Sequence, residues 1–340
     1  MAVTLKEIAS LANVSRATVD KVIHSRPGVK KETQDRINAI LKELNYHPNP
    51  IGKALVNSKK PQKIGVVLTP DYNTYIQYTL MGVRRAEKEM AYYGIEVSIK
   101  MLTTYEPAEL IGILNEYHEM NISGLALLPI DDEQVKIKLN QMSQSGIAVV
   151  TFNSRLKGID EICFVGQDHY KGGRVAAGLM EKIIPEGGDI GVIICSTNLS
   201  CHQDRLAGFS TRLEKNKKLS IVDIQENRDR KEEAFRFTLK YCNQYPNLKG
   251  IYLAGGGLTG VSNALSLVNK KHEIKIVCHD LLPESSDLLQ EGVVDFVLGQ
   301  SATEQGYQII KILFDYLIKE QTPKDKFFEI PVEIIISDLL

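Results

Sequence analysis

Arg16 and Lys21 combine residue type and spacing in a way that suits contact with a nucleic acid. Both lie on the outward face of a predicted short helix, whose opposite face carries Val19 and Val22. An arginine can donate paired hydrogen bonds to O6 and N7 of guanine, and a lysine can reach the same base edge or a phosphate. This face therefore indicates a DNA-reading helix, although ordinary solvated charges would give the same pattern.

A second pattern with chemical meaning is Gly255-x-Gly257-x-x-Gly260, which follows a predicted strand and precedes a predicted helix. Asp280 stands twenty residues later, at the end of the next predicted strand, and together these residues spell a dinucleotide-binding fingerprint. The pattern lies late in the chain, however, and no catalytic acid and base set accompanies it. GxSxG, HExxH, P-loop and kinase signatures are absent from the sequence. We therefore expect a protein that is not an enzyme, with an NAD-binding enzyme as a remote alternative.

The five cysteines and seven histidines are scattered, without the spacing of metal ligands. The sequence contains no CxxC pair, so we expect reduced, structural thiols in a cytoplasmic protein. We expect neither a metal nor another cofactor. Because no apolar run approaches the length of a membrane span and no signal peptide is recognisable, we expect no contact with a membrane.

Two capped helices must position the outward cations. Thr4 is a natural N-cap with Glu7 three residues later, so the first helix is predicted to begin with a capping box. Asn13 suits the left-handed backbone of a tight turn, and Ser15 can cap the second helix. Two helices joined by so short a turn form a helix-turn-helix, whose second helix can enter the major groove of DNA.

Charge is unevenly divided along the chain. Residues 1–60 contain eleven Lys and Arg against five Asp and Glu, which leaves 30 against 37 for residues 61–340. The net charges are therefore +6 and −7, although the whole chain carries only −1. A small basic head on an acidic body suits binding to a polyanion, and a merely solvated basic surface is the alternative.

The rest of the head and a hinge follow. Residues 31–45 carry apolar side chains at helical spacing, which should close a three-helix core. Asn49 and Pro50 suit the N-cap and first position of another short helix, which would be marginal by itself in water. We expect a DNA-binding head over 1–47 and a hinge helix with its linker over 48–62.

Residues 3–58 resemble the DNA-binding head and hinge of the LacI/GalR family of bacterial transcription regulators, through VTLKEIASLANVS, KETQDRI, LNYHPN and the hinge leucine. The resemblance implies that Arg16, Ala17 and Lys21 read bases. It also implies that Leu55 wedges into the minor groove and kinks the operator, unless that side chain is an anchor against the body. The implied DNA-binding residues are Thr4, Leu5, Ser15, Arg16, Ala17, Thr18, Lys21, His24, Thr33, Asn49 and Leu55. Two positions depart from the family pattern, Lys30 at a helix start and Gly52 within the hinge.

From Ile64 onward, short apolar runs such as IGVVLT, IAVVTF and IKIVC alternate with helical segments. This alternation predicts doubly wound parallel sheets, and about a dozen strands are too many for one compact sheet. The expected fold is a small all-α helix-turn-helix head before an α/β body of two Rossmann-like lobes.

The order of these elements is similar to that of the ribose-binding-protein-like effector domain, the periplasmic binding protein type I fold, over 63–340. That resemblance implies three crossings between lobes, near residues 165, 299 and 325. The expected domain boundaries are an N-lobe of about 63–165 and 300–325, and a C-lobe of about 166–299 and 326–340.

The resemblance also implies an effector site between the lobes, at the carboxyl ends of the strands. Tyr75 keeps an aromatic face for a sugar ring, whereas Ile76 does not, and Arg205 and Asp280 match residues that hold sugar hydroxyls. Guanidinium, carboxylate and amide groups suit paired hydroxyls because each can form two parallel hydrogen bonds. The structural alternative for Arg205 and Asp280 is an interlobe salt bridge. The implied effector-binding residues are Asn73, Tyr75, Ile76, Asn153, Ser154, Arg155, Arg205, Gly255, Gly256, Asp280 and Gln300.

The loop after GIYLA departs from the family, which usually has an Asn-Asp pair where this chain has three glycines, 255–257. Bare backbone N–H groups at a helix start favour an anion, or a close carbonyl or hydroxyl. We expect a small neutral sugar or polyol as the effector. A phosphorylated or acidic effector is the alternative, since the glycine loop, Arg155 and Arg205 together could hold an anion.

Together these features predict a cytoplasmic repressor that binds double-stranded, palindromic operator DNA as a homodimer. The effector would close the two lobes and thereby change whether the hinge helices can pair. The partners implied are operator DNA, a small-molecule effector and a second copy of the chain.

Overall fold

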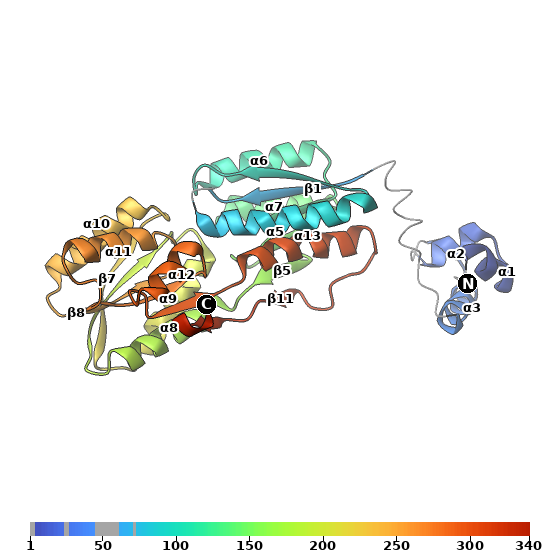
Figure 1. The fold of residues 1–340 in the computed structure, drawn as a ribbon. Coiled ribbons are helices and arrows are strands. Elements are labelled where there is room, and N and C mark those ends of the chain that lie inside the picture. The colour runs from blue at the N-terminus through green and yellow to red at the C-terminus, as the bar shows by residue number, and fades with distance from the viewer. Residues whose placement is uncertain (1–3, 24–26, 45–60, 71–72) are drawn as a thin grey trace. The chain divides into compact units, whose positions relative to one another are not determined.

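The computed structural model describes residues 4–23, 27–44, 61–70 and 73–340 (Figure 1). The chain divides into two compact units, residues 1–52 and 53–340. The expected hinge helix lies outside the described residues, and so do three residues expected to contact DNA, His24, Asn49 and Leu55.

The first unit contains the predicted helix-turn-helix and a third helix. These helices are α1 (Leu5–Leu11), α2 (Arg16–Ile23) and α3 (Lys31–Glu43). The predicted capping box is confirmed, because the Glu7 backbone donates to Thr4 Oγ1 at 3.3 Å and the Thr4 backbone donates to Glu7 Oε2 at 2.7 Å. Asn13 has a φ of 49°, which is the left-handed turn that its side chain suits. Buried apolar residues from all three helices form a core, Ile8, Ala9, Ala12, Val19, Val22 and Ile37.

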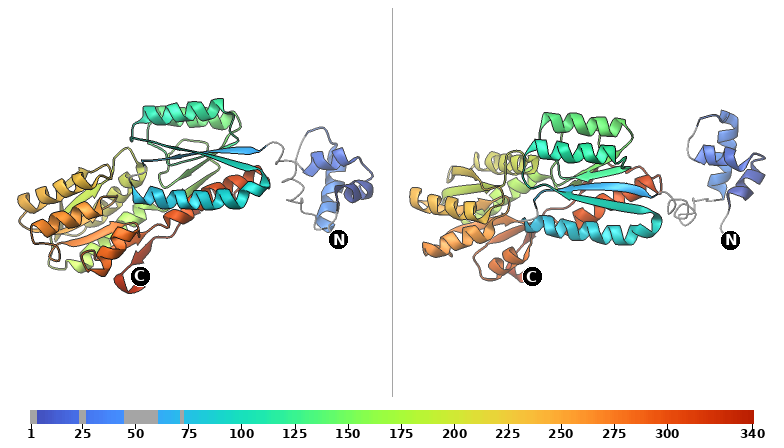
Figure 2. Two further views of the ribbon diagram at one scale, coloured as in Figure 1. Left: turned by 45° about the horizontal axis from the view of Figure 1, so that its top comes forward. Right: turned by 90° about the horizontal axis from the view of Figure 1, so that it is seen from above.

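The N-lobe is built on a parallel six-stranded sheet in the order β11-β5-β4-β3-β1-β2. Helices α6 and α7 cover one face of the sheet and α5 and α13 the other (Figures 1 and 2). Its strands are β1 (Gln62–Leu68), β2 (Ile95–Met101), β3 (Gly124–Leu127), β4 (Ala148–Phe152), β5 (Cys163–Gly166) and β11 (Phe327–Glu329). Its helices are α5 (Thr74–Met90), η1 (Ala91–Tyr93), α6 (Pro107–Glu119), α7 (Glu133–Gln144) and α13 (Ala302–Leu317).

The C-lobe repeats this plan with a sheet in the order β12-β10-β9-β8-β6-β7, in which only β12 runs antiparallel to its neighbour. Its strands are β6 (Gly188–Ile194), β7 (Leu219–Glu226), β8 (Leu248–Leu253), β9 (Lys275–His279), β10 (Phe296–Gly299) and β12 (Glu333–Ile335). Its helices are α8 (His169–Ile183), α9 (Ser200–Leu213), α10 (Lys231–Gln244), α11 (Leu258–Leu267), α12 (Pro283–Gln290) and η2 (Ser337–Leu339). The two-lobed α/β body with a small helical head is therefore the fold that the sequence predicted.

The chain passes between the lobes after β5, after β10 and after β11. The last crossing lies between Glu329 and Glu333, so the expected position near residue 325 is wrong. The segment FFEIPVEIII forms two strands, because β11 pairs with β5 in one lobe and β12 pairs with β10 in the other. Pro331 stands between the two strands, and its missing N–H cannot continue a strand ladder. Residues 327–329 therefore belong to the N-lobe sheet.

The lobes also touch each other directly. Leu199, Cys195 and Cys201 of the C-lobe are buried in the same apolar cluster as the core of the N-lobe. The backbone N–H of Asp131 donates to the carbonyl of Asn198 across the lobes at 2.8 Å. Among the described residues, none of the helices is both long and apolar enough to span a lipid bilayer. That part of the chain also has no cluster of three residues suited to binding a metal ion.

Candidate functional site

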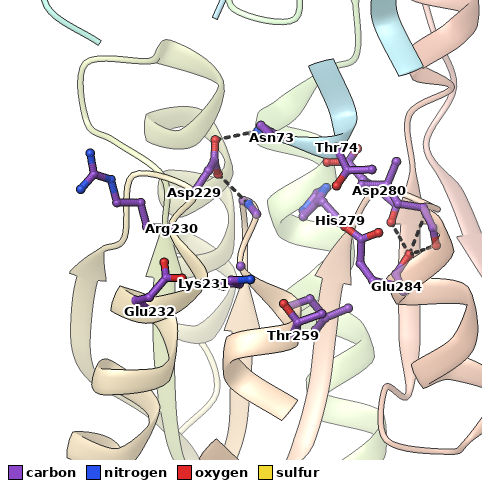
Figure 3. Close-up of a pocket in the computed structure, with 16 residues that line it drawn as sticks. Asn73, Thr74, Asp229, Arg230, Lys231, Glu232, Thr259, His279, Asp280 and Glu284 are labelled. Carbon is purple, nitrogen blue, oxygen red and sulfur yellow. Dashed lines mark hydrogen bonds between the residues drawn. The ribbon is translucent and has the colours of Figure 1, made fainter. Parts of the chain in front are cut away.

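A cavity of about 690 Å³ lies between the lobes, at the carboxyl ends of β1, β7, β8 and β9 (Figure 3). The N-lobe contributes Asn73 and Thr74, and the other lining residues come from the C-lobe. Four of the residues predicted to bind an effector line this cavity, namely Asn73, Gly255, Gly256 and Asp280. Parallel strands present their carboxyl ends at one edge, which is why residues so far apart in sequence meet here.

Arg205 of α9 is the central cation of the site, and only 2% of its surface is exposed. One terminal guanidinium nitrogen donates to the carbonyl of Ala254 at 2.7 Å, and the other donates to Gln300 Oε1 at 3.0 Å. Gln300 in turn donates from Nε2 to Asp280 Oδ1 at 2.6 Å. Arg205, Asp280 and Gln300, three of the residues predicted to bind an effector, therefore form one hydrogen-bonded group. Arg205 and Asp280 both belong to the C-lobe, and Gln300 lies at the crossing between β10 and α13. Among the described residues, Arg205 and Asp280 form no interlobe salt bridge.

Asp280 is a buried carboxyl group at the end of β9, held in left-handed backbone with a φ of 71°. Burial raises its pKa from 3.8 to about 6, against the opposing effects of the Arg205 charge and the Gln300 hydrogen bond. The nearby acidic groups Asp229 and Glu284 raise the pKa further. At neutral pH the Asp280 carboxyl group is therefore ionised, and the protein interior stabilises its charge poorly. Hydrogen-bond donors on a ligand would stabilise that charge.

Polar atoms without hydrogen-bond partners are concentrated around Arg205. Buried polar groups in folded proteins almost always have partners, so a cluster of exceptions indicates the place of a ligand or water. The electrostatic influence of Arg205 on the pKa values of Tyr75, His169, His202 and His279 shows that these groups surround it. Among the described residues, the unpartnered atoms near this centre are Tyr75 Oη, Asn153 Oδ1, His169 Nδ1, His202 Nδ1, Arg205 Nε and His279 Nδ1.

The hydrogen bonds of His169 fix what its free nitrogen can do. Its Nε2 lies 2.6 Å from the carbonyl oxygen of Asn153, and because a carbonyl only accepts, Nε2 must carry the proton. Burial and the neighbouring Arg205 lower the pKa of His169, so the ring is neutral and Nδ1 is an acceptor. Asn153 Oδ1 is an acceptor as well. Both atoms therefore require a donor such as a hydroxyl group.

Other predicted residues occupy different surroundings. Ile76 is buried in the apolar core of the N-lobe, and Ser154 Oγ accepts a hydrogen bond from the Cys201 backbone at 3.4 Å. Arg155 pairs with Glu161 at 3.5 Å and lines a separate cavity of about 540 Å³. The structure thus does not bring Arg155 to the cavity that contains Asp280.

Sequence reasoning missed several residues of the site. Asp229, in the loop after β7, accepts hydrogen bonds from Asn73 Nδ2 at 2.6 Å and Tyr105 Oη at 2.8 Å. It also accepts one from the backbone N–H of Gly256 at 2.7 Å (Figure 3). The one sequence signal for Asp229 is that it follows a strand, and nothing in its neighbourhood forms a motif. The buried histidines of α8, α9 and β9, His169, His202 and His279, were likewise not predicted.

In the head, the residues predicted to read bases are available to DNA. Arg16, Ala17 and Lys21 are all exposed on α2, while Val19 and Val22 are buried on its other face. Thr4 and Ser15 are exposed beside them, and Leu5, Thr18 and Thr33 are partly exposed. Ser15 Oγ accepts from the Thr18 backbone at 3.1 Å, as expected of an N-cap.

Known proteins match both parts of the chain. Residues 4–49 match the bacterial regulatory proteins of the lacI family, and residues 64–321 match the periplasmic binding protein domain. The HTH-type transcriptional regulator MalR of Streptococcus pneumoniae is 27% identical over 287 residues, which are 81% of this chain and 82% of MalR. Catabolite control protein A of Staphylococcus xylosus is 26% identical over 236 residues, which are 62% of this chain and 70% of that protein.

Solved structures share the fold of the body. The XylFII molecule is 27% identical with a TM-score of 0.73, covering 81% of this chain and 99% of that chain. A solute-binding protein of Burkholderia graminis in complex with D-arabinose is 19% identical with a TM-score of 0.75, covering 82% of this chain and 96% of that chain. The second likeness concerns the fold alone. With its head matched to one family and most of its length matched to the other, the chain belongs to the LacI/GalR family of bacterial transcription regulators, with a periplasmic-binding-protein-like body.

Proposed function

We propose that this DNA-binding regulator is a repressor whose hold on a palindromic operator is controlled by a neutral sugar or polyol between its lobes. The observation that carries the proposal is the cluster of unpartnered buried polar atoms around Arg205, in the body of a chain that begins with a helix-turn-helix. A ligand rich in hydroxyl groups would satisfy these atoms, since each hydroxyl both donates and accepts a hydrogen bond.

The free acceptors favour a neutral ligand over an anion. Asp280, Asn153 Oδ1 and His169 Nδ1 all need donors, and an ionised phosphate or carboxylate offers none. The buried cation of the site is already engaged, because both terminal nitrogens of Arg205 donate to the protein itself. The backbone N–H of Gly256, which the sequence left open for an anion, donates to Asp229. A phosphorylated or acidic effector is therefore the weaker candidate.

The glycines of the dinucleotide-like pattern have structural reasons of their own. Gly257 has a φ of 99°, a left-handed conformation that glycine adopts without strain. A Cβ on Gly260 would lie 2.0 Å from the carbonyl oxygen of Lys231, so this glycine permits the close contact of α10 with α11. These reasons support a binding protein over an NAD-dependent enzyme.

A homodimer would regulate the operator. In each copy the hinge, residues 48–62, would separate the DNA-binding head from the body. The head buries only a small three-helix core, so body-to-body contact would supply most of the dimer. Two heads related by a two-fold axis would read two half-sites, and closure of the lobes on the effector would change whether the hinges pair. We place this protein in the cytoplasm, where operator DNA is available.

A thermal-shift screen tests the proposed effector class. Free sugars and polyols are expected to raise the unfolding temperature of the full-length protein, by about 5–10 °C at a hundred times the dissociation constant. Sugar phosphates and NAD(H) at the same concentrations serve as the comparison. They should not raise the unfolding temperature more than the free sugars and polyols do. Stabilisation by phosphorylated sugars but not by the free sugars would reverse the assignment.

Arg16→Ala is expected to relax the base preference at one position of each operator half-site. Loss of a paired hydrogen bond to guanine removes about 1–3 kcal/mol of discrimination at that position. The measurement is selection of bound sequences from a random DNA pool, followed by titration of single-base variants of the selected operator. Lys6→Ala, which removes an exposed cation from α1 and not from the base-reading helix, is the control. An unchanged preference profile for Arg16→Ala would remove this residue from the reading set.

A further inference from the structure

We propose that Asp229 is a positioning residue that latches the two lobes together in their closed arrangement. Asp229 is a buried residue, 9% exposed, and lies on the C-lobe side, in the loop after β7. Asn73 and Tyr105, both of the N-lobe, donate to Oδ2 at 2.6 and 2.8 Å. Hydrogen bonds to an ionised acceptor are stronger than those between neutral groups. One buried carboxylate therefore joins the two lobes at the rim of the cavity (Figure 3).

The C-lobe holds Asp229 firmly in place for this task. Asp229 Oδ1 accepts from the Gly256 backbone at 2.7 Å, and the Asp229 backbone N–H donates to Asn227 Oδ1 at 3.0 Å. Asn227 Nδ2 donates to the carbonyl of Gly256 at 2.7 Å, which completes a bracket between the two loops. Asp229 has a φ of 57°, a left-handed conformation that aspartate tolerates better than most residues. The carboxylate is thus fixed within its own lobe, and only its bonds to the N-lobe can open.

The three-glycine loop leaves room for this carboxylate. A Cβ added at Gly256 would lie 3.0 Å from Asp229 Oδ1, and one at Gly255 would lie 3.1 Å from the same atom. Side chains at these positions would crowd Asp229 or displace it. The anion that the bare backbone N–H groups attract is therefore an internal one, supplied by the neighbouring loop.

Several polar atoms are buried behind Asp229 without a hydrogen-bond partner in the protein. Tyr75 Oη, Asn153 Oδ1 and Arg205 Nε have almost no accessible surface and no partner. Burying such atoms opposes closure of the lobes, so other interactions must stabilise the closed arrangement. The bonds from Asn73 and Tyr105 to Asp229 cross the lobes and can do this. An effector would then reach Arg205 only after these bonds open.

Hydrogen exchange of the effector-free, full-length protein tests the latch without any ligand. The Asp131 backbone N–H donates across the lobes to Asn198 and reports lobe opening, whereas amides of β3 and β8 report unfolding of each lobe. Asp229→Asn keeps an acceptor for Gly256 but places an amide donor against Asn73 and Tyr105. We expect about tenfold faster exchange at Asp131 in this variant, with β3 and β8 unchanged.

Tyr105→Phe and Asp223→Asn make the result specific. Tyr105→Phe removes the latch hydrogen bond to Asp229 and the interaction of the same hydroxyl with Cys195, but keeps the Asp229 carboxylate and its bond from Asn73, so exchange at Asp131 should accelerate by a smaller factor. Asp223→Asn removes a carboxylate of β7 that pairs with Lys240 inside the C-lobe at 2.6 Å, and should leave Asp131 unchanged. If Asp229→Asn also accelerates hydrogen exchange in β3 or β8, the variant destabilises a lobe itself. The exchange rate at Asp131 in Tyr105→Phe then decides whether the latch exists.

The latch would be overturned if the Asp131 amide exchanged at the wild-type rate in both Asp229→Asn and Tyr105→Phe. It would also be overturned if Asp223→Asn accelerated exchange at Asp131 as much as Asp229→Asn does. The latch rests on the proposed function in one respect only, the class of effector that enters the cleft. Because the exchange measurement contains no sugar, a thermal-shift screen that fails to find an effector leaves its result intact. Conversely, loss of the latch would not affect the evidence for the effector class.

Discussion

Arg205→Ala is expected to abolish effector binding, with a loss of at least about a thousandfold in affinity. The guanidinium donates to Gln300, which in turn donates to Asp280, and its Nε is buried without a hydrogen-bond partner in the protein. Hydrogen bonds to charged groups contribute about 1.5–3 kcal/mol each, and losing two or three of them accounts for a change of this size. Binding of the sugar selected by the thermal-shift screen, measured by calorimetry, tests this expectation.

Two further variants separate binding from folding. Arg205→Lys keeps the charge but replaces the planar guanidinium fork, whose two terminal nitrogens reach Ala254 and Gln300, with a single ammonium nitrogen, so it should recover only part of the affinity. Arg212→Ala removes another arginine of α9, one that pairs with Glu181 at 2.7 Å away from the cavity. This control should bind the effector normally. Retained affinity in a folded Arg205→Ala protein would show that Arg205 is structural.

Asp280→Asn is expected to weaken effector binding strongly and to stabilise the effector-free protein at neutral pH. The pKa of Asp280 is raised from 3.8 to about 6, so its ionised form costs folding free energy. The stability associated with the protonated group is fully present below pH 3.8 and is lost as the pH rises through 6. Asparagine is never ionised, so the variant should gain about 2–3 kcal/mol at pH 8.

Unfolding in urea at pH 8 and pH 5 measures this gain, which should be clearly smaller at pH 5. An asparagine side chain can still accept the Gln300 hydrogen bond, and it tolerates the left-handed backbone at this position. In the wild-type protein, affinity for the effector should fall as the pH drops through 6, because protonated Asp280 loses acceptor capacity. A variant that is less stable at pH 8 would mean that Asp280 is held mainly by structural ion pairing.

The order of elements could be predicted from the sequence because it depends on neighbours along the chain. The capping box joins Thr4 to Glu7, and apolar runs followed by helical segments mark each strand and helix. The last crossing was misplaced for the opposite reason. Residues 327–335 contain one nearly continuous apolar stretch, and only pairing with β5 and β10 divides it between two sheets.

Of the residues predicted to bind an effector, Arg205, Asp280 and Gln300 meet in one hydrogen-bonded group, although they lie far apart in sequence. The sequence gives no means of separating Arg205 from Arg155. Arg205 lies within α9 and Arg155 follows β4, yet packing buries the first and leaves the second half exposed beside Glu161. Burial, which gives a charge its influence in a binding site, is a property of the assembled lobes.

By itself, the amino-acid sequence determined that a basic helix-turn-helix precedes an α/β body of two lobes, because capping, periodicity and local charge act over a few residues. It also determined that three glycines at 255–257 leave backbone N–H groups bare. Only the tertiary structure decided what those groups bind. Asp229 reaches Gly256 from another loop, and Asn73 and Tyr105 reach Asp229 from the other lobe. Such contacts depend on where whole strands end in space, and local sequence patterns do not encode that position.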